Sequence, residues 1–339
     1  MRLSIFAYSR QGCHTAQRIS ALLAGEDCRC YTMEKYLISG FLPMEKPAVN
    51  FYGPLFHSCD ALIFVGSCGI AVRQIAPHVR DKKADPAVVC IDELGKFVIP
   101  LLSGHIGGAN ALAQKIAEGI GAVPVVTTAT DINGKFSVDA WAARNSCYIS
   151  SMAAAKAVSA KILEAPVPLL SRFPLKTPLP SGVIEEAQGE LGILLSWKEE
   201  APFQETLRLV PPVLHLGIGC RKGISREAVS QAVEQVFKDY AIDRHAIKCA
   251  ASIDLKAQEA GLLDFCREAE IPIAFYTVQE LQAVPGEFTK SQFVSSITGV
   301  DNVCERSAML GADRLIVRKT ACNGVTVAVA EENWEVYFG

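Results

Sequence analysis

A histidine set among glycines is the feature of this chain that points most clearly to chemistry. It lies in the segment Ser103-Gly104-His105-Ile106-Gly107-Gly108. The glycines alone are typical of a tight turn between a strand and a helix, because glycine adopts positive φ angles readily. Such a turn does not require an imidazole. Since imidazole changes its charge near pH 7, His105 is a candidate for general acid/base work or for pairing with a carboxylate.

A second polar segment follows the next expected strand and reads Thr127-Thr128-Ala129-Thr130-Asp131. We expect it beside the His105 loop, at the carboxyl edge of a sheet, where α/β proteins bind ligands. There the Thr128 hydroxyl and the Asp131 carboxylate can orient a water molecule or His105. A helix cap is an equally common role for such residues. The turn at residues 66–69 ends a neighbouring strand and is a candidate source of further amide donors at that edge.

The chain has a second candidate site, in which basic residues follow strands. Arg221 and Lys222 lie in a glycine turn just before an expected helix, and Lys256 and Lys319 end two later strands. Adjacent cations at the start of a helix can clamp an anion, helped by the helix dipole, although a solvated basic loop has the same composition. We therefore predict that these four residues bind a polyanionic ligand. The histidines lack metal-ligand spacing, so we predict no protein metal site.

The elements around these segments predict an α/β fold with two α/β domains. In residues 1–130, apolar strands alternate with helices, which favours a doubly wound sheet. The strand at 97–102 either forms a hairpin with the strand before it or extends the sheet, and residues 36–54 read as irregular. The expected strands are 3–8, 30–33, 60–65, 87–92, 97–102 and 123–126, and the expected helices are 13–23, 70–77 and 109–120.

Beyond residue 130 the pattern changes twice. Residues 131–212 predict a middle region with helices at 139–147 and 152–163, followed by a proline-rich linker. Residues 213–339 resume the alternation and predict a second, smaller α/β domain. Its expected strands are 213–218, 247–253, 273–276, 314–317, 324–330 and 335–338, and its expected helices are 225–240, 257–270 and 303–311.

Size and composition exclude several classes of protein. The 339 residues are 50% apolar and carry a formal net charge of −3, which gives no overall attraction to nucleic acid or to an anionic membrane. No apolar run approaches the roughly 20 residues that a membrane helix needs. The 12 cysteines are scattered without a CxxC pair, which is typical of small core residues in a reducing compartment. We predict a cytoplasmic protein with a small-molecule ligand, and we leave a homodimer open.

Several motifs, in order along nearly the whole chain, carry a resemblance to a known family. The run PLLSGHIGGANALAQKIAEGIGAVPVVTTATD resembles the signature of the cobalt-precorrin-5A hydrolases of the anaerobic cobalamin (vitamin B12) pathway. The sequences GIGCRKG, SIDLKAQEAGL, VCERSAML and VRKTACNGVTVAVA are similar to the C-terminal domain of that family, and a related domain occurs alone in the aerobic pathway. The glycine loop carries one His where we expect a second or a shorter spacing, which argues against a two-His mechanism.

The resemblance implies a reaction and a role for each candidate residue. Such enzymes open the δ-lactone on ring A of a cobalt-containing tetrapyrrole and release acetaldehyde. His105 would then be the general base, Asp131 would orient it, and the amides of Gly107 and Gly108 would stabilise the oxyanion. The four cations would hold peripheral carboxylates. The cobalt belongs to the substrate, so no organic cofactor or protein-bound metal is expected. Further substrate contacts are expected from Ser103, Gly104, Gly107, Gly108 and Thr128.

Two other functions remain open from the residues alone. A nucleotide- or S-adenosylmethionine-dependent enzyme would bind its cofactor with the first glycine loop, but the chain lacks an early GxG and the acidic residue after a second strand. A non-catalytic carrier that passes tetrapyrroles between enzymes would need only the basic C-terminal site. A cofactor titration tests the first alternative, and binding without acetaldehyde release would support the second.

Overall fold

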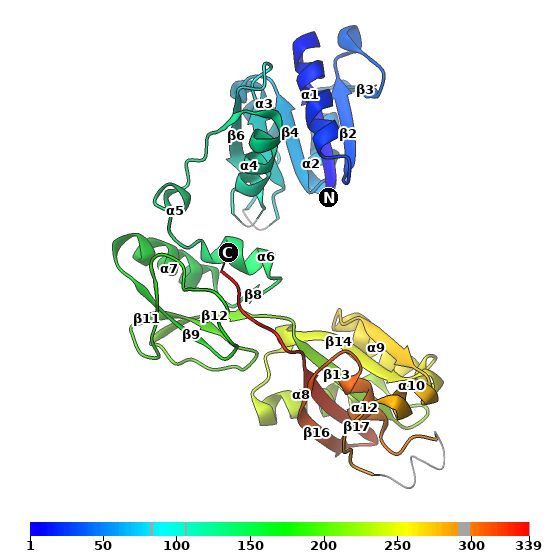
Figure 1. The fold of residues 1–339 in the computed structure, drawn as a ribbon. Coiled ribbons are helices and arrows are strands. Elements are labelled where there is room, and N and C mark those ends of the chain that lie inside the picture. The colour runs from blue at the N-terminus through cyan, green and yellow to red at the C-terminus, as the bar shows by residue number, and fades with distance from the viewer. Residues whose placement is uncertain (82–83, 106, 291–298, 339) are drawn as a thin grey trace. The chain divides into compact units, whose positions relative to one another are not determined.

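The computed structural model describes residues 1–81, 84–105, 107–290 and 299–338. The chain divides into two compact units, Met1–Ala140 and Trp141–Gly339. Both units combine helices with sheets, as Figure 1 shows. Most strand pairs of the first two sheets run parallel, and the last sheet has two parallel and two antiparallel pairs. The predicted α/β fold class is therefore confirmed.

The first unit contains a seven-stranded sheet with the strand order β3-β2-β1-β4-β5-β6-β7. The central strands β1, β4 and β5 are apolar and buried along almost their whole length, as expected when helices cover both faces. The strands are β1 (Arg2–Ala7), β2 (Asp27–Thr32), β3 (Phe41–Pro43), β4 (Ala61–Val65), β5 (Ala87–Ile91), β6 (Phe97–Leu102) and β7 (Val123–Pro124).

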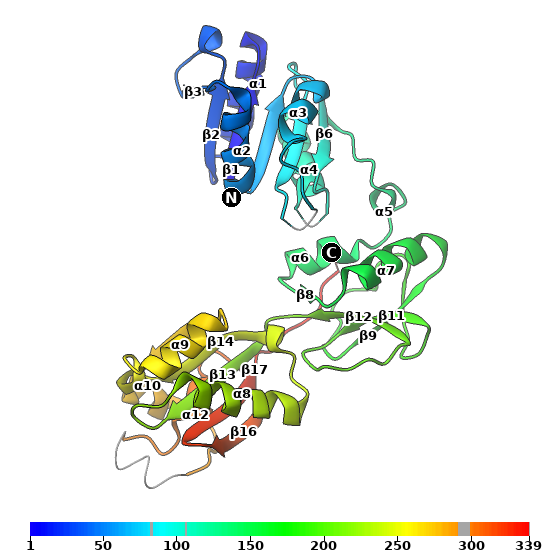
Figure 2. The ribbon, with the colours of Figure 1, turned by 180° about the vertical axis from the view of Figure 1, so that it is seen from behind.

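Side chains alternate along each strand, so each face of this sheet presents its own set of apolar side chains to the helices that cover it. Ile5 belongs to the core beneath α1 and α4, and its neighbour Phe6 belongs to the core beneath α2 and α3. Figure 1 views the first face, and Figure 2 views the second. The covering helices are α1 (Arg10–Leu22), α2 (Ala48–Ser58), α3 (Cys68–Ile75) and α4 (Ala109–Ile120), and a 3₁₀ turn η1 (Glu34–Tyr36) follows β2. Two short helices, α5 (Ala129–Ile132) and α6 (Val138–Arg144), follow β7, and α6 extends past Ala140, the last residue of the first unit.

Helix α2 corrects the prediction that residues 36–54 are irregular. Gly53 and Pro54 weaken the helical signal in the sequence, because both are poor helix formers. The helix instead gains its stability from packing, since Phe51, Tyr52 and Phe56 are buried in the aromatic core beneath it. Tertiary burial here outweighs local propensity.

The direction of β6 places the His105 loop at an unexpected edge of the sheet. Strand β6 pairs antiparallel with β5, which confirms the hairpin, and β7 runs parallel to β6. The loop after β6 therefore lies at the edge where β1, β4 and β5 begin. The predicted location at the carboxyl edge of those strands is wrong, and the turn at residues 66–69, which follows β4, lies at the opposite edge. The prediction that residues 127–131 follow β7 to the same edge as the loop agrees with this pairing.

The second unit begins with a sheet that the sequence did not predict. Its strand order is β10-β9-β11-β12-β8, and α7 (Met152–Glu164) packs against it. Residues 131–212 were expected to be helices and a linker, because prolines and glycines interrupt their short apolar runs; Pro168 and Gly192 in fact lie within strands. The strands are β8 (Tyr148–Ile149), β9 (Val167–Ser171), β10 (Val183–Glu185), β11 (Leu191–Leu195) and β12 (Glu205–Val210).

The last sheet has the strand order β15-β14-β13-β17-β16. Helix α12 packs on β13 at Gly217, where a Cβ atom would lie 1.9 Å from the carbonyl oxygen of Cys304, so glycine is required. The strands are β13 (Leu214–Cys220), β14 (Ile247–Ile253), β15 (Ile273–Tyr276), β16 (Arg314–Cys322) and β17 (Val325–Glu331), and the helical elements are α8 (Arg226–Tyr240), η2 (Arg244–Ala246), η3 (Asp254–Lys256), α9 (Ala260–Glu268), α10 (Val278–Ala283) and α12 (Val303–Met309).

Two expectations for this domain are corrected. Strand β16 continues to Cys322, so Lys319 lies within a strand and does not end one. The described residues 335–338 form no strand; Val336 makes an isolated bridge with Leu175 of the middle region. The apolar alternation of that segment reflects this docking, since Trp334 and Phe338 pack around Trp141.

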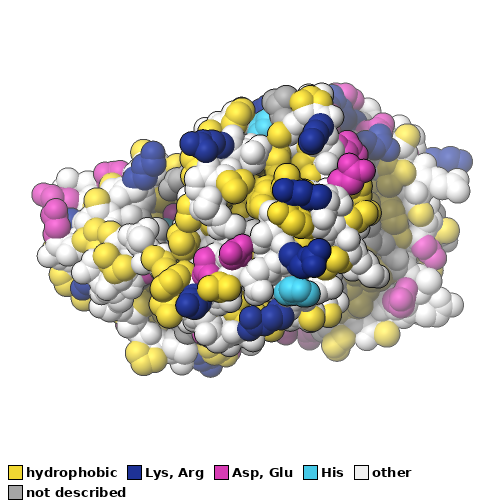
Figure 3. Space-filling view, turned by 90° about the horizontal axis from the view of Figure 1, so that it is seen from above, with side chains coloured by type: hydrophobic (Ala, Val, Ile, Leu, Met, Phe, Trp, Pro, Cys, Tyr) yellow, Lys and Arg dark blue, Asp and Glu magenta, His cyan; other side chains and the backbone are white. Residues whose placement is uncertain are grey.

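The surface agrees with the modest net charge. On the face that Figure 3 shows, lysine and arginine side chains lie singly or in small groups among apolar and acidic ones. Within the described parts of the chain, we find no helix whose length and apolar content would let it span a bilayer.

Candidate functional site

His105 lies between two carboxylates. Its Nε2 atom is 2.9 Å from Oδ2 of Asp131, and its Nδ1 atom is 3.2 Å from Oδ1 of Asp139. The hydroxyl of Thr130 lies 3.2 Å from the same Nε2. The His105 side chain is 20% exposed, so it is accessible to a ligand and does not point into a packed core. The predicted contact between His105 and Asp131 is confirmed.

The loop that carries His105 is closed by its own backbone. The amides of Gly108, Ala109 and Asn110 donate to the carbonyls of His105, Ser103 and Gly104 at 3.0, 3.1 and 3.0 Å. Gly107 packs so tightly that a Cβ atom there would lie 2.3 Å from the Cβ of Ser103. The loop is therefore pre-shaped, but the Gly108 amide is already engaged. In this conformation it does not offer the free donor that an oxyanion hole needs.

Three further side chains position Asp131 and its neighbours. The Thr128 hydroxyl donates to Asp131 Oδ2, and the Asn110 amide donates to both Thr128 Oγ1 and Asp131 Oδ2 at 2.9 Å. On the other side of the loop, Ser103 donates its hydroxyl to the carbonyl of Asp85, 2.9 Å away. These contacts place the predicted residues Ser103, Gly104, Thr128 and Asp131 in one cluster around His105.

The two carboxylates differ in exposure, which separates their roles. The Asp139 side chain is 8% exposed and also accepts hydrogen bonds from Ser137 and the Ala140 amide, whereas the Asp131 side chain is 39% exposed. Asp139 is thus the buried carboxylate that holds the imidazole in place, and Asp131 is the carboxylate that a ligand can reach. Both Asp131 and Asp139 contact the imidazole, so the orienting role expected of Asp131 stays a prediction, and Asp139 is a second candidate for it.

The surroundings fix the charges of this pair. The hydrogen bond to Asp139 is the largest cause that raises the pKa of His105; the bond to Asp131 adds to it, and together they outweigh burial, which acts to lower the pKa. Burial acts to raise the pKa of Asp131, but hydrogen bonds from Thr128 and His105 outweigh burial and leave the pKa lowered. Both shifts favour the ion pair of an imidazolium and a carboxylate. Such a pair can donate one proton and accept another.

The second unit carries the predicted basic site as a cavity of about 610 Å³. It opens at the carboxyl ends of β13 and β14, the edge at which α/β sheets bind ligands, and is bounded by the first residues of α12 and by the β16–β17 hairpin. All the predicted cations line it, namely Arg221, Lys222, Lys256 and Lys319.

Most of this positive charge is not neutralised by the protein. Lys256 pairs with Glu259, with 3.0 Å between Nζ and Oε2. Among the residues that the structure describes, no acidic side chain forms an ion pair with Arg221, Lys222 or Lys319. An anionic ligand would supply the missing partners, since cations that lack a counter-ion bind carboxylates or phosphates strongly.

Comparison with known proteins identifies the family. A family model described as Cobalamin synthesis G N-terminal matches residues 50–131, and one described as Cobalamin synthesis G C-terminus matches residues 214–330. A cobalt-precorrin-5A hydrolase from Salmonella typhimurium (strain LT2) is 32% identical, and the alignment covers 96% of this chain and 97% of that protein. The chain belongs to the cobalt-precorrin-5A hydrolase family.

A second curated relative agrees with the first in extent. A cobalt-precorrin-5A hydrolase from Priestia megaterium is 30% identical over 96% of this chain and 94% of that protein. A solved structure, a cobalamin biosynthesis protein G homolog from Sulfolobus solfataricus, is 21% identical over 97% of each chain with a TM-score of 0.42. The family's N-terminal match contains His105 and Asp131, and its C-terminal match contains the cations of the cavity.

Sequence reasoning missed Asn110, Thr130 and Asp139. Asp139 was assigned to an expected helix start, and the apolar pattern of that helix gives no sign that the carboxylate turns back to His105, 34 positions earlier in the chain. Asn110 had a weak signal, because a polar side chain in the first turn after a glycine loop often faces the loop. Thr130 was named only as part of its segment.

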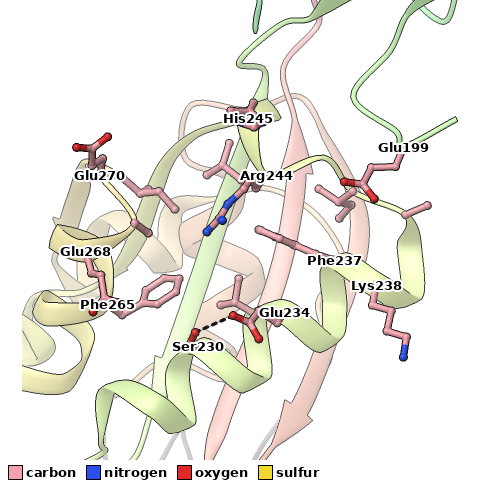
Figure 4. Close-up of a pocket in the computed structure, with 16 residues that line it drawn as sticks. Glu199, Ser230, Glu234, Phe237, Lys238, Arg244, His245, Phe265, Glu268 and Glu270 are labelled. Atoms are coloured by element: carbon pink, nitrogen blue, oxygen red, sulfur yellow. Dashed lines mark hydrogen bonds between the residues drawn. The ribbon is translucent and has the colours of Figure 1, made fainter. Parts of the chain in front are cut away.

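A larger cavity of about 910 Å³, shown in Figure 4, lies between α8, η2 and α9. Four glutamates line it beside Lys238, Arg244 and His245, and Glu234 accepts a hydrogen bond from Ser230 at 3.1 Å. Like charges repel, so this lining disfavours a carboxylate-rich ligand. The cation-lined cavity is therefore the better binding site for one. The glutamates are Glu199, Glu234, Glu268 and Glu270.

The described part of the chain offers no set of side chains that would bind a metal ion. Among the described residues, no group of three or more His, Cys, Asp or Glu side chains comes together as a metal site would require. The expectation that this protein needs no metal or organic cofactor of its own stays a prediction.

Proposed function

We propose that this protein is a cobalt-precorrin-5A hydrolase, which opens the ring A δ-lactone of its substrate and releases acetaldehyde to give cobalt-precorrin-5B. Family membership supports the reaction. The observation that carries the mechanism is the position of His105, whose two ring nitrogens each face a carboxylate. The proposal places the enzyme in the cytoplasm, where reducing conditions suit its 12 free cysteines.

The first step is hydrolysis of the lactone. Asp131, ionised and exposed, accepts a proton from water as the water oxygen attacks the lactone carbonyl. The acyl–oxygen bond breaks, and the imidazolium of His105 donates its Nε2 proton to the departing oxygen. The products of this step are a carboxylic acid and a hydroxyl group on the two-carbon bridge. Asp139 keeps the imidazole oriented throughout, through its contact with Nδ1.

The second step is cleavage of the carbon–carbon bond. His105, now neutral, removes the proton from the new hydroxyl group, and its raised pKa makes it an effective base at this point. The carbon–oxygen double bond of acetaldehyde forms as the bond to the macrocycle breaks, and the electron pair passes into the conjugated ring. The proton held on Asp131 is passed to the macrocycle or to water, which restores the starting pair. One dyad thus serves both steps.

The cation-lined cavity would hold the substrate by its rim. A tetrapyrrole of this class carries many acetate and propionate side chains, which match several separate cations better than one deep charge. Arg221, Lys222 and Lys319 lack acidic partners among the described residues, so they gain most from such carboxylates. The cobalt arrives as part of the substrate.

The test is anaerobic incubation with cobalt-precorrin-5A, with acetaldehyde followed by a coupled dehydrogenase. We expect one acetaldehyde for each substrate consumed. His105→Ala should lower the rate by about 10²–10⁴-fold, the usual worth of general acid/base assistance. His245→Ala is the matched control, because His245 also contacts an aspartate, Asp243, at 2.8 Å but is a member of neither cluster. Full turnover by His105→Ala removes this residue from the mechanism, and tight binding without acetaldehyde from the wild type supports a carrier instead.

A further inference from the structure

Glu305 is a fully buried carboxylate directly beneath the cation-lined cavity. It lies on α12, whose first residues Val303 and Cys304 line that cavity, and its exposed fraction is 0%. It belongs to the motif VCERSAML, to which the mechanism above gives no role. A buried carboxylate is costly unless every lone pair finds a donor, so its partners indicate what it is for.

Among the described residues, Glu305 has partners at Lys319, which lines the cavity, and at Thr289, which does not. Oε1 accepts the backbone amide of Lys319 at 2.7 Å and the hydroxyl of Thr289 at 2.8 Å, and Oε2 accepts the backbone amide of Thr289 at 2.8 Å. Asn302, which also lines the cavity, donates to the carbonyl of Thr289 at 2.9 Å. Glu305 of α12 and Asn302, the buried N-cap residue of that helix, therefore hold the backbone at Thr289 and Lys319.

The amide of Lys319 needs this partner because β16 is irregular at that point. The pairing of β16 with β17 shifts register between Val317 and Thr320, so residues 318 and 319 fall outside the regular ladder. Such irregularities re-aim side chains beside functional sites, at the cost of a ladder hydrogen bond. Glu305 accepts a hydrogen bond from the Lys319 amide, which lies outside the regular ladder, while the Lys319 side chain lines the cavity.

We propose that Glu305 is a positioning residue, which fixes Lys319 so that its ammonium group meets a substrate carboxylate. The inference rests on the proposed function of the cavity as a binding site for a carboxylate-rich tetrapyrrole. A carboxylate suits the task better than an amide, because it only accepts hydrogen bonds and here meets three donors. Glutamine would turn its NH₂ group toward at least one of those donors.

The test is a double-mutant cycle between Glu305→Gln and Lys319→Ala, measured as binding of uroporphyrin, an octacarboxylate tetrapyrrole, by fluorescence quenching. We expect each single variant to raise Kd about tenfold and the double variant to be no weaker than Lys319→Ala alone, because a residue that acts through Lys319 has nothing left to position. In the hydrolase assay the same change should appear in KM, with kcat within about twofold.

Ser307→Ala is the matched control. Ser307 lies on the same helix, is equally buried, and donates to the carbonyls of Ala251 and Cys304 at 3.2 Å without touching Thr289 or Lys319. It should lower thermal stability but leave Kd unchanged. Should Glu305→Gln fail to fold, Glu305→Asp, which keeps the charge but withdraws it by one methylene, should still raise Kd.

The outcomes separate this inference from the proposed function. Additive losses in the cycle, an unchanged Kd in the Glu305 variants, or an equal loss in Ser307→Ala would overturn the positioning role even if the wild type releases acetaldehyde. Uroporphyrin that does not bind to the wild type would overturn it too. Binding with the expected cycle but no acetaldehyde would support the positioning role and refute the hydrolase.

Discussion

Replacing Asp139 by Asn tests which carboxylate orients the reactive imidazole. Asp139 faces Nδ1 of His105 at 3.2 Å and is 8% exposed, so the substitution keeps the shape of the site and removes one buried negative charge. The amide can still accept a hydrogen bond, but it stabilises an imidazolium far less than a carboxylate does. The structure around Asp131 is untouched by this change.

The expected loss follows from the contacts. A hydrogen bond to a charged group contributes about 1.5–3 kcal/mol, and a tenfold change in rate corresponds to about 1.4 kcal/mol. One of the two carboxylate contacts of His105 is lost, so kcat/KM should fall about ten- to hundredfold near neutral pH. A smaller loss than for His105→Ala is expected, since the imidazole itself remains.

The pH dependence tests the role of Asp139 more specifically than the size of the rate loss does. The proposed mechanism needs the imidazolium of His105 and the carboxylate of Asp131. The raised pKa of His105 keeps the imidazolium present above the ordinary histidine range, and activity is lost as the pH rises through that raised pKa; the lowered pKa of Asp131 keeps its carboxylate at pH values below the ordinary aspartate range. Because Asp139 is the largest cause of the raised pKa of His105, Asp139→Asn should move the alkaline limb of kcat/KM to lower pH and leave the acid limb in place.

The assay is acetaldehyde release across pH, with a thermal melt for each variant. Asp243→Asn is the control, because Asp243 is also buried and contacts a histidine, His245; it should melt earlier but keep the wild-type pH profile. An Asp139→Asn enzyme with an unmoved alkaline limb and near-normal turnover would refute the assignment.

Three other predictions follow from the same two clusters. Asp131→Asn should lower kcat by about 10²–10⁴-fold with little change in KM, because it removes the exposed proton acceptor; steady-state kinetics on the substrate check this, and a change confined to KM would contradict it. Lys222→Glu should raise KM about tenfold or more at constant kcat, and added salt should shrink the difference from the wild type, since exposed charges are screened; a salt-independent KM would argue against rim binding. Gly107→Ala should destabilise the protein by about 1–3 kcal/mol, the usual cost of overpacking, because the new Cβ would meet that of Ser103; an unchanged denaturant midpoint would show that the loop is looser than described.

Local sequence pattern was enough to find the His105 loop and the cations of the cavity. A strand, a glycine turn and a helix are encoded in apolar periodicity and in glycine placement, so the positions of His105 and of Arg221 could be read along the chain. The order of the motifs was enough for the family. These features depend on neighbours a few residues apart, which is the range over which backbone preference acts.

The contact of Asp139 with His105 required the folded chain. The direction of β6 was within reach of the sequence, because the five residues between β5 and β6 are too few for a parallel crossover. That direction moved the loop to the other edge of the sheet. Asp139 comes within 3.2 Å of His105 because two segments 34 positions apart share one site. The strands of residues 131–212 were missed for a related reason. Pro168 and Gly192 lower the local preference for a strand, and burial in the sheet compensates for that loss. Sequence therefore names the residues that can react, and long-range packing determines which of them meet.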